Sequence, residues 1–186
     1  MSDVDIRAAA PGDVAAIARI YADAVRRGTA TFEVEPPDEA EIARRMQALV
    51  AGNHPYLVAE RSGAIAGYAY ASPYHLRPAY RWTVEDSIYV DPQFQRQGIG
   101  RRLMGRLLAD AEARGFRQVI ALIGDSTNAA SIARLHDLDR RRCSRPKANA
   151  RIVVVRFKRG RRLHRFDRQG NSTSLSGVGW SPGGGR

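Results

Sequence analysis

The feature that most constrains the fold is a glycine-containing turn between an extended apolar run and an amphipathic run. Residues 83–90 read TVEDSIYV, and residues 91–108 continue DPQFQRQGIGRRLMGRLL. Ile99, Leu103 and Leu107 then recur at helical spacing up to Gly115. Glycine lets the backbone approach a ligand closely, and a helix N-terminus offers unpaired N–H groups and the positive end of its dipole. The sequence therefore predicts a strand–turn–helix unit that can bind a pyrophosphate.

Two common phosphate-binding motifs do not match this turn. A Walker loop requires Lys followed by Ser or Thr after its second glycine, whereas Arg101 and Arg102 stand here. A dinucleotide fingerprint has three glycines early in a βαβ unit, whereas this turn has only Gly98 and Gly100 and lies in mid-chain. Residue type excludes both motifs.

The flanking sequence predicts alternating strands and helices in one α/β (α+β) domain. Strands are expected at 4–9, 55–60, 64–71, 83–90 and 117–123, with Ser62 and Gly63 as a hairpin turn. Helices are expected at 13–27, at 38–51 and from 99 to the stop at Gly115, and polar residues 124–128 open another helical start. The second helix begins at Asp38 with Glu41 in capping-box position, and its predicted buried residues are Ile42, Met46, Leu49 and Val50.

Composition excludes several classes of protein. A chain of 186 residues with 44% hydrophobic content can bury one core without a second domain. Its single cysteine, Cys143, can form no internal disulfide and has no CxxC partner, so no metal is expected. No run of about 18 apolar residues occurs, and the first ten residues lack the apolar core of a signal peptide. We therefore expect a cytoplasmic protein without a membrane partner.

The net charge of +11 is confined to the C-terminal part of the chain. Residues 1–133 carry 15 arginines against 16 acidic residues, whereas residues 134–186 carry 15 basic residues against three acidic ones. The first 133 residues thus have no overall basic surface, and charge says nothing about their substrate.

Several motifs together resemble a known enzyme family. Gln95, Gly98 and Gly100, after SIYVDP, resemble the acetyl-coenzyme A pyrophosphate loop of the GNAT superfamily of N-acetyltransferases. TVEDSIYVDPQFQRQGIG, ARGFRQVIALIGDSTNAAS, IYADAVRRGTATFE and LRPAYRWTVE are similar to the phosphinothricin or methionine sulfoximine acetyltransferase branch, over about residues 4–133. The resemblance implies a GNAT fold, with a mixed central sheet whose strands splay apart between flanking helices. It also implies acetyl-CoA as cofactor, a small-molecule amine as substrate and a homodimer.

The resemblance also implies roles for particular residues. Glu85 matches the base of this branch, acting directly or through water, and would otherwise be a plain solvent-facing strand residue. Tyr89 or Val90 supplies the backbone N–H for the acetyl carbonyl. Asn128 matches an asparagine that binds the cofactor, although it could equally cap a helix. The remaining implied cofactor contacts are Ser87, Ile88, Gln95, Arg96, Gln97, Gly98, Ile99, Gly100 and Arg101.

The acceptor pocket is implied by two further segments. TATFE contributes Phe32 and Glu33, and LRPAYRW contributes Arg77, Tyr80 and Arg81. A guanidinium can grip the carboxylate of an amino-acid-like substrate through two hydrogen bonds, so Arg77 or Arg81 is the candidate for that contact. Each could instead be an exposed loop charge.

The resemblance ends at about Ile132. His136 stands one residue later than the family's acid, which rotates a helical side chain by about 100° and leaves its role open. Residues 134–169 may be read as a divergent end of the domain, a polyanion-binding basic tail or the product of a local sequence error. We expect one domain over residues 1–169 and a disordered Gly/Ser-rich tail over 170–186.

The sequence thus predicts an acetyl-CoA-dependent N-acetyltransferase acting on a small amine, with an amino-acid analogue as the candidate substrate. The alternative is a GNAT-like protein that binds RNA or another polyanion with little turnover. Nucleic acid is the less favoured partner, because the basic segment reads as a strand and no regular interleaving of aromatic residues in it suggests base stacking.

Overall fold

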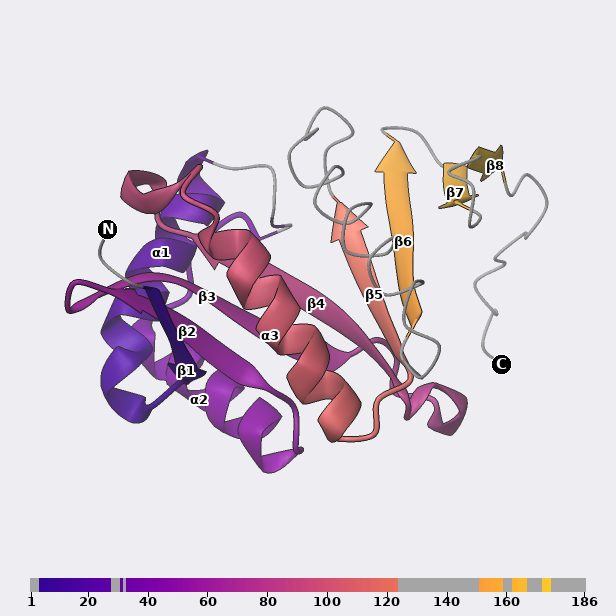
Figure 1. Ribbon diagram of the computed structural model, residues 1–186, viewed down its shortest axis with the longest axis horizontal. Coiled ribbons are helices and arrows are strands. Elements are labelled where there is room, and N and C mark those ends of the chain that lie inside the picture. The colour runs from indigo at the N-terminus through magenta and orange to yellow at the C-terminus, as the bar shows by residue number, and fades with distance from the viewer. Residues whose placement is uncertain are drawn as a thin grey trace, which may run out of the picture.

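The protein is described from a computed structural model, which places residues 4–27, 31, 33–123, 151–158, 162–166 and 172–174 (Figure 1). The helices are α1 (Val14–Arg27), α2 (Glu39–Ala51) and α3 (Ile99–Ala113), with short 3-10 turns at Pro11–Asp13, Pro78–Tyr80 and Pro92–Phe94. The strands are β1 (Val4–Ala8), β2 (Tyr56–Arg61), β3 (Ala64–Pro73), β4 (Thr83–Val90), β5 (Gln118–Ile123), β6 (Arg151–Lys158), β7 (Arg162–Phe166) and β8 (Ser172–Ser174).

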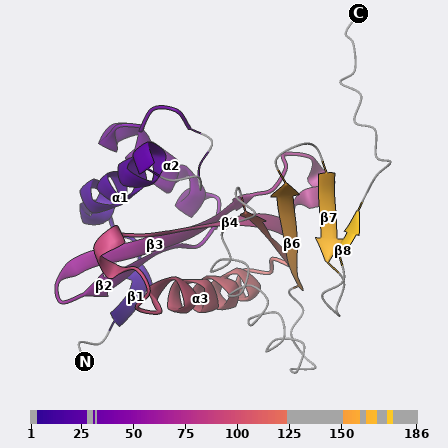
Figure 2. The same cartoon turned by 90° about the horizontal axis from the view of Figure 1, so that it is seen from above.

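The described strands form one mixed sheet whose spatial order follows the chain from β1 to β8. Pairing is antiparallel from β1 to β4, parallel from β4 through β5 to β6, and antiparallel from β6 to β8. Helices α1 and α2 cover one face of the sheet and α3 covers the other (Figure 2). The predicted fold class, a mixed sheet between helices, is confirmed.

Local sequence signals account for the turns that connect these elements. Ser62 and Gly63 have φ angles of 52° and 79°, and two consecutive positive values match the twist of a tight hairpin between β2 and β3. At the start of α2, the Asp38 carboxylate accepts a hydrogen bond of 2.8 Å from the Glu41 N–H. Gly115 ends the α3 segment with a φ of +87°. These predicted boundaries are confirmed.

The prediction for the buried face of α2 was wrong at its end. Ile42 and Met46 are buried, but Val50 is 53% exposed. At about 100° per residue, Val50 lies roughly 80° around the helix from Ile42 and so falls at the edge of the apolar stripe. It also stands in the last turn of the helix, one residue before Ala51.

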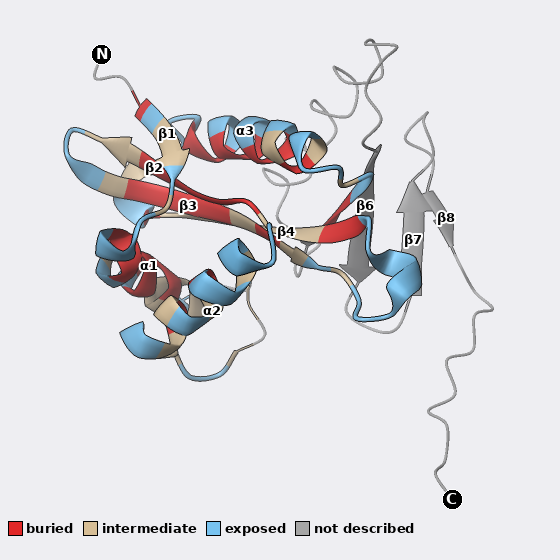
Figure 3. Cartoon of the chain, turned by 90° about the horizontal axis from the view of Figure 1, so that it is seen from below, coloured by how far each residue is buried: buried red, intermediate tan, exposed pale blue. Residues whose placement is uncertain are grey.

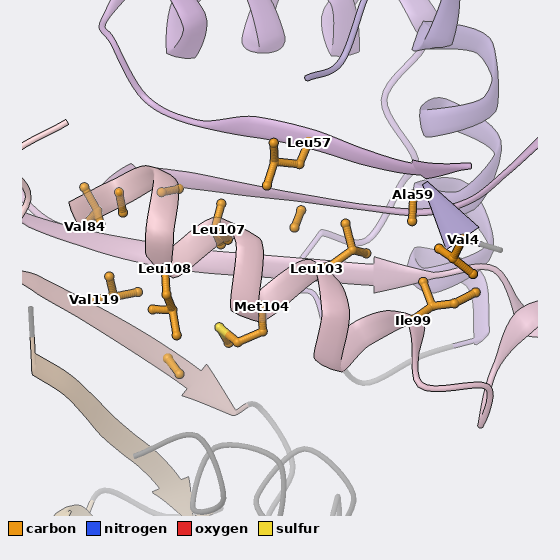
Figure 4. Packing of buried hydrophobic residues seen from close by; sticks show 14 of the residues in the cluster. Val4, Leu57, Ala59, Val84, Ile99, Leu103, Met104, Leu107, Leu108 and Val119 are labelled. Atoms are coloured by element: carbon orange, nitrogen blue, oxygen red, sulfur yellow. The ribbon is translucent and has the colours of Figure 1, made fainter. Parts of the chain in front are cut away.

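Each face of the sheet has its own apolar core. On the α3 face, Leu103, Leu107 and Leu108 pack against small and branched residues of the strands, including Leu57, Ala59 and Val84 (Figure 4). On the other face, Ile17, Ile20 and Tyr21 of α1 and Ile42 and Met46 of α2 pack against Tyr56, Val58 and Tyr68. Figure 3 shows the buried residues concentrated where the helices meet the sheet.

The C-terminal strands bear on the predicted end of the domain at residue 169. The apolar run RIVVVRF forms a strand, β6, which lies beside β5. The short β8 lies within residues 170–186, the segment expected to be a disordered tail, and it pairs with β7. The domain boundary at residue 169 stays a prediction. Asn128 and His136 lie outside the described residues. Among the helices that are described, none is long and apolar enough to cross a membrane.

Leu107→Ala tests the α3 core. Leu107 has no exposed surface, so its truncation should leave a cavity and lower the free energy of unfolding by about 2–5 kcal/mol. Leu76, which is 93% exposed, provides the matched control, and Leu76→Ala should change stability by less than about 0.5 kcal/mol. Urea unfolding followed by circular dichroism measures both, and equal effects would contradict the assigned core.

Candidate active site

The candidate site is built on the unequal pairing of β4 with its two neighbours. β4 pairs with β3 along its whole length, from Val84 opposite Pro73 to Val90 opposite Gly67. It pairs with β5 only from Thr83 to Asp86, opposite Gln118 to Ala121. Beyond this last rung the two strands diverge (Figure 1), as the resemblance implied. The edge of β4 from Ser87 to Val90 is therefore left without a strand partner on the β5 side.

Hydrogen bonding at both ends of β4 shows which amides face that open edge. The Asp91 N–H donates to the Ala66 carbonyl at 3.0 Å, and the Thr83 carbonyl accepts from the Tyr74 N–H at 3.3 Å. Successive residues of a strand direct their N–H and C=O groups to opposite sides, so the odd-numbered residues of β4 bond to β3. The N–H groups of Ile88 and Val90 then point to the open edge. Of the two predicted carbonyl donors, this register favours Val90 over Tyr89.

The loop between β4 and α3 has the geometry of an anion site. Gly98 is the N-cap of α3 and has a φ of 80°, and Arg96 also has a positive φ, of 61°. The first N–H groups of a helix have no intrahelical partner. Those of Arg101 and Arg102 donate back to the Gly98 carbonyl, each at 3.1 Å. The N–H groups that remain at the helix start are those of Ile99 and Gly100, within the predicted set.

The space above this loop is suited to a phosphate group. A Cβ placed on Gly98 would meet no atom within 4 Å, although its backbone conformation strains any larger residue. Gln97 lies along the loop and donates from its side chain to the Gln93 carbonyl at 3.2 Å. The open cradle and the helix N-terminus together fit the pyrophosphate of acetyl-CoA.

A buried carboxylate, missed by the sequence analysis, anchors this loop. Asp91 is only 2% exposed and forms an ion pair of 2.6 Å with Arg19 of α1. Its carboxylate also accepts from the Gln93 N–H at 2.9 Å, which shapes the turn at Pro92. The Asp-Pro pair in YVDPQF was the available signal, because this pair favours turn initiation.

The arginines around the loop differ in role. The Arg102 guanidinium donates to the Val4 carbonyl, and that of Arg106 donates to the Ile6 carbonyl and pairs with Asp110. These contacts tie α3 to β1. Arg96 and Arg101 are exposed beside the loop, and their contact with phosphate stays a prediction.

Glu85, Ser87 and Tyr89 share the sheet face that α1 and α2 cover. The Tyr89 ring lies 5.1 Å from that of Tyr21 and 5.1 Å from that of Tyr68, measured between centroids, and these contacts hold it in place. Glu85 is partly buried, and this burial raises the pKa of its carboxyl above the usual value. A raised pKa brings a carboxylate closer to the strength that a general base needs.

A pocket of about 330 Å³ lies on this same face, between α2 and the sheet. Its lining includes Tyr70 and Ser72 of β3, which stand opposite Ser87 and Glu85 in the register. The other lining residues are Tyr21, Ile42, Arg44, Arg45, Ala48, Leu49, Tyr56 and Tyr68. Burial raises the pKa of Tyr56, Tyr68 and Tyr70, so these phenols stay neutral hydrogen-bonding groups. The alternating Tyr68 and Tyr70 were the sequence signal for this tyrosine-lined pocket, and the sequence analysis missed it.

The predicted acceptor segment around Glu33 is fixed to both helices. The Arg45 guanidinium pairs with the Glu33 carboxylate at 2.6 Å and with that of Glu41 at 2.7 Å. The Tyr21 hydroxyl lies 3.0 Å from the Thr31 hydroxyl. Glu33 is therefore engaged in an ion pair beside the pocket, and Phe32 lies outside the described residues.

The loop between β3 and β4 carries the other predicted acceptor residues. It leaves β3 at Pro73, one residue beyond Ser72, and so begins at the Glu85 end of β4. Tyr80 packs its ring against Tyr74 and His75, and the Arg81 guanidinium lies 5.3 Å from the centre of the Trp82 ring. Arg77 is exposed at the start of the 3-10 turn. These contacts occupy Arg81 and make Arg77 the stronger candidate for a carboxylate contact.

Comparison with known proteins agrees with this geometry. The profile of the Acetyltransferase (GNAT) family matches residues 12–138. The chain belongs to the GNAT acetyltransferase family. This match confirms the predicted family. At the level of the family it also confirms the predicted acetyl-CoA-dependent N-acetyltransferase. The alternative of polyanion binding is not favoured.

Individual relatives narrow the resemblance. The phosphinothricin N-acetyltransferase of Alcaligenes faecalis is 48% identical over 127 residues, which are 68% of this chain and 64% of the relative, slightly under two thirds of its length. The L-methionine sulfoximine/L-methionine sulfone acetyltransferase of Salmonella typhimurium is 37% identical, over 72% of this chain and 77% of the relative. A crystal structure of a phosphinothricin acetyltransferase from Sinorhizobium meliloti in complex with AcCoA has a TM-score of 0.70 and 43% identity, covering 73% of each chain.

Gly98→Val tests the anion loop. The substitution fills the open cradle and strains a backbone at φ +80°, so affinity for acetyl-CoA should fall tenfold or more, on the order of 1.4 kcal/mol. Gly105→Val in the middle of α3 is the matched control, because its Cβ also meets open space but its backbone is helical. Calorimetry with acetyl-CoA should separate the two, and equal affinities would refute the loop assignment.

Proposed function

We propose that this protein transfers the acetyl group of acetyl-CoA to the amine of a small amino-acid analogue of the phosphinothricin or methionine sulfoximine type. The observation that carries the proposal is the open edge of β4, which leads from the anion loop to Glu85 and the neighbouring pocket. The names of the relatives supply the substrate class. A homodimer and a cytoplasmic location remain part of the proposal.

Acetyl-CoA, when bound, supplies an acetyl group activated as a thioester. The chain's part is to hold the pyrophosphate on the N–H groups of Ile99 and Gly100 and to offer strand amides to the rest of the molecule. A pre-oriented N–H group stabilises negative charge that develops on a carbonyl oxygen without any reorganisation. The Ile88 and Val90 amides take that role, because the alternation of β4 directs them away from β3.

Glu85 acts as the base that accepts the proton of the acceptor amine. It lies on the pocket face of β4, and Ser72, its register partner, lines the pocket. Its carboxyl must be ionised to accept a proton, so activity should fall as the pH drops through its raised pKa. The tyrosines of the pocket provide neutral hydroxyl groups for a polar acceptor, and Arg77 receives its carboxylate.

A screen of thiol release tests the proposed activity. Wild-type protein with acetyl-CoA should release coenzyme A when phosphinothricin, methionine sulfoximine or methionine sulfone is added, and mass spectrometry should find the N-acetylated product. Release with other amines but with none of these three would contradict the proposed substrate class. Absence of release with every amine would contradict the proposed activity.

Glu85→Gln tests the base. The amide keeps the size of the side chain but cannot accept the proton, so kcat should fall by about 10² while affinity for acetyl-CoA stays nearly unchanged. The part of the acidic limb of the pH profile that reflects ionisation of Glu85 should also disappear. Glu39→Gln, an exposed change in the first turn of α2, serves as control and should behave as wild type. A normal kcat and an unaltered pH profile in Glu85→Gln would show that another group is the base.

Arg77→Ala tests the carboxylate contact. Loss of a charged hydrogen bond of about 1.5–3 kcal/mol should raise KM for the amino-acid acceptor by roughly tenfold to a hundredfold, with little change in KM for acetyl-CoA. The matching measurement uses the corresponding amine without its carboxylate, for which wild type and Arg77→Ala should be equal. Equal losses with both acceptors would instead assign Arg77 to the structure of the loop.

A further inference from the structure

A second carboxyl group stands beside Glu85 at the point where β4 and β5 separate. Asp86 occupies the last rung that the two strands share, opposite Ala121. Because side chains alternate along a strand, Glu85 lies on the α1 and α2 face and Asp86 on the α3 face. This point of separation, called the fork below, thus has one carboxyl group on each side of the sheet. The proposed mechanism uses only Glu85.

The surroundings of Asp86 are unusual for a carboxyl group. Its Oδ1 atom is buried and has no hydrogen-bond partner among the residues that the structure describes. Its register neighbours are Ala71 and Ala121, which are buried and too small to cover it. The residues of α3 that are buried against this face are apolar, among them Leu107 and Leu108. A carboxyl group with one oxygen buried and unpaired is more costly to ionise than one in water, so these surroundings favour its protonated form.

Asp86 stands at the fork itself, on the last rung that β4 and β5 share, and its carboxyl group lies against its own backbone N–H. Burial, with a smaller effect of the neighbouring Glu85 charge, raises the pKa of Asp86 to about 7. A large fraction of these side chains therefore carries a proton at neutral pH.

We propose that Asp86 is the proton donor to the coenzyme A sulfur as it leaves. This inference rests on the proposed acetyl transfer and adds a second proton-transferring group to it. The open edge of β4 runs from Val90, beside the anion loop, to Asp86, a distance of about 13 Å at roughly 3.3 Å per residue. A thioester held on this edge, with its pyrophosphate at the start of α3, ends at the fork between the two carboxyl groups.

The proton balance of the reaction closes with these two groups. The amine nitrogen forms its bond to the acetyl carbon, the C–S bond breaks, and the electron pair of that bond stays on sulfur. Glu85 accepts the proton that leaves nitrogen, and Asp86 gives its proton to sulfur, so that a thiol departs. Glu85 then loses a proton to water and Asp86 regains one, which restores both groups.

Asp86→Asn tests this role through the pH dependence of a ratio. The ratio of wild-type to variant kcat cancels the titration of the acceptor amine. We expect it to be about 10² at pH 6 and to fall by about tenfold per pH unit above the pKa of Asp86. The corresponding ratio for Glu85→Gln should behave oppositely, rising with pH through the pKa of Glu85 and then staying constant. A ratio for Asp86→Asn that does not vary with pH would assign Asp86 a structural role and overturn the inference.

A second readout needs no turnover. A carboxyl group whose pKa is raised by folding destabilises the folded state increasingly as the pH rises from about 4 to its folded pKa, and by a constant amount above that. Asp86→Asn should therefore raise Tm at pH 8 and leave it nearly unchanged at pH 4. Asp5→Asn, the same change at an exposed position of β1, should shift Tm at neither pH. A lower Tm for Asp86→Asn at pH 8 would show that Asp86 has a partner and would overturn the inference.

The outcomes separate this inference from the proposed function. If wild-type protein acetylates the amino-acid analogues but Asp86→Asn matches it at every pH, the inference fails and the proposed function stands. If wild-type protein releases no thiol with any amine, the proposed function fails and the inference falls with it. Retained acetyl-CoA affinity in Asp86→Asn, measured by calorimetry, must accompany the kinetic loss, because a proton donor is not required for binding.

Discussion

The site depends on one constraint, which is that β4 is fully paired on one side and only half paired on the other. Its bonds to β3 fix the strand, while its bonds to β5 end at Asp86. The released edge carries backbone N–H groups at a fixed spacing, and these groups belong to a rigid strand rather than to a mobile loop. A fork in a sheet therefore provides pre-oriented donors without requiring an unpaired strand at the edge of the fold.

The two cores hold this fork from opposite faces. Helix α3 packs on the face that includes Val84 and thereby sets its own N-terminus at the end of β4, where the anion loop begins. Helices α1 and α2 pack on the face that includes Tyr68 and leave the pocket beside Glu85. The Arg19–Asp91 ion pair links the helices on the two faces of the sheet, because it joins α1 to the turn that precedes α3. Packing thus places the anion loop at one end of β4 and Glu85, whose register partner Ser72 lines the pocket, toward the other end.

Sequence alone predicted the elements in which a local signal and hydrophobic periodicity agreed. The strand at 83–90, the glycine turn and α3 are of this kind, as are the hairpin at Ser62 and Gly63 and the cap at Asp38. It could not choose between Tyr89 and Val90 as donor, because the direction of an amide depends on which neighbour a strand pairs with. The ion pair of Asp91 with Arg19 and the burial of Asp86 depend on residues far along the chain, and neither leaves a pattern in the local sequence.

Amide hydrogen exchange by NMR with and without acetyl-CoA tests the central claim most directly. The amides of Ile88 and Val90 face the open edge, whereas that of Tyr89 already bonds to β3. We therefore expect acetyl-CoA to slow exchange at Ile88 and Val90 much more than at Tyr89, together with slower exchange at Ile99 and Gly100. Protection of Tyr89 without change at its two neighbours, or equal protection along all of β4, would contradict the assignment of this edge as the cofactor-binding surface.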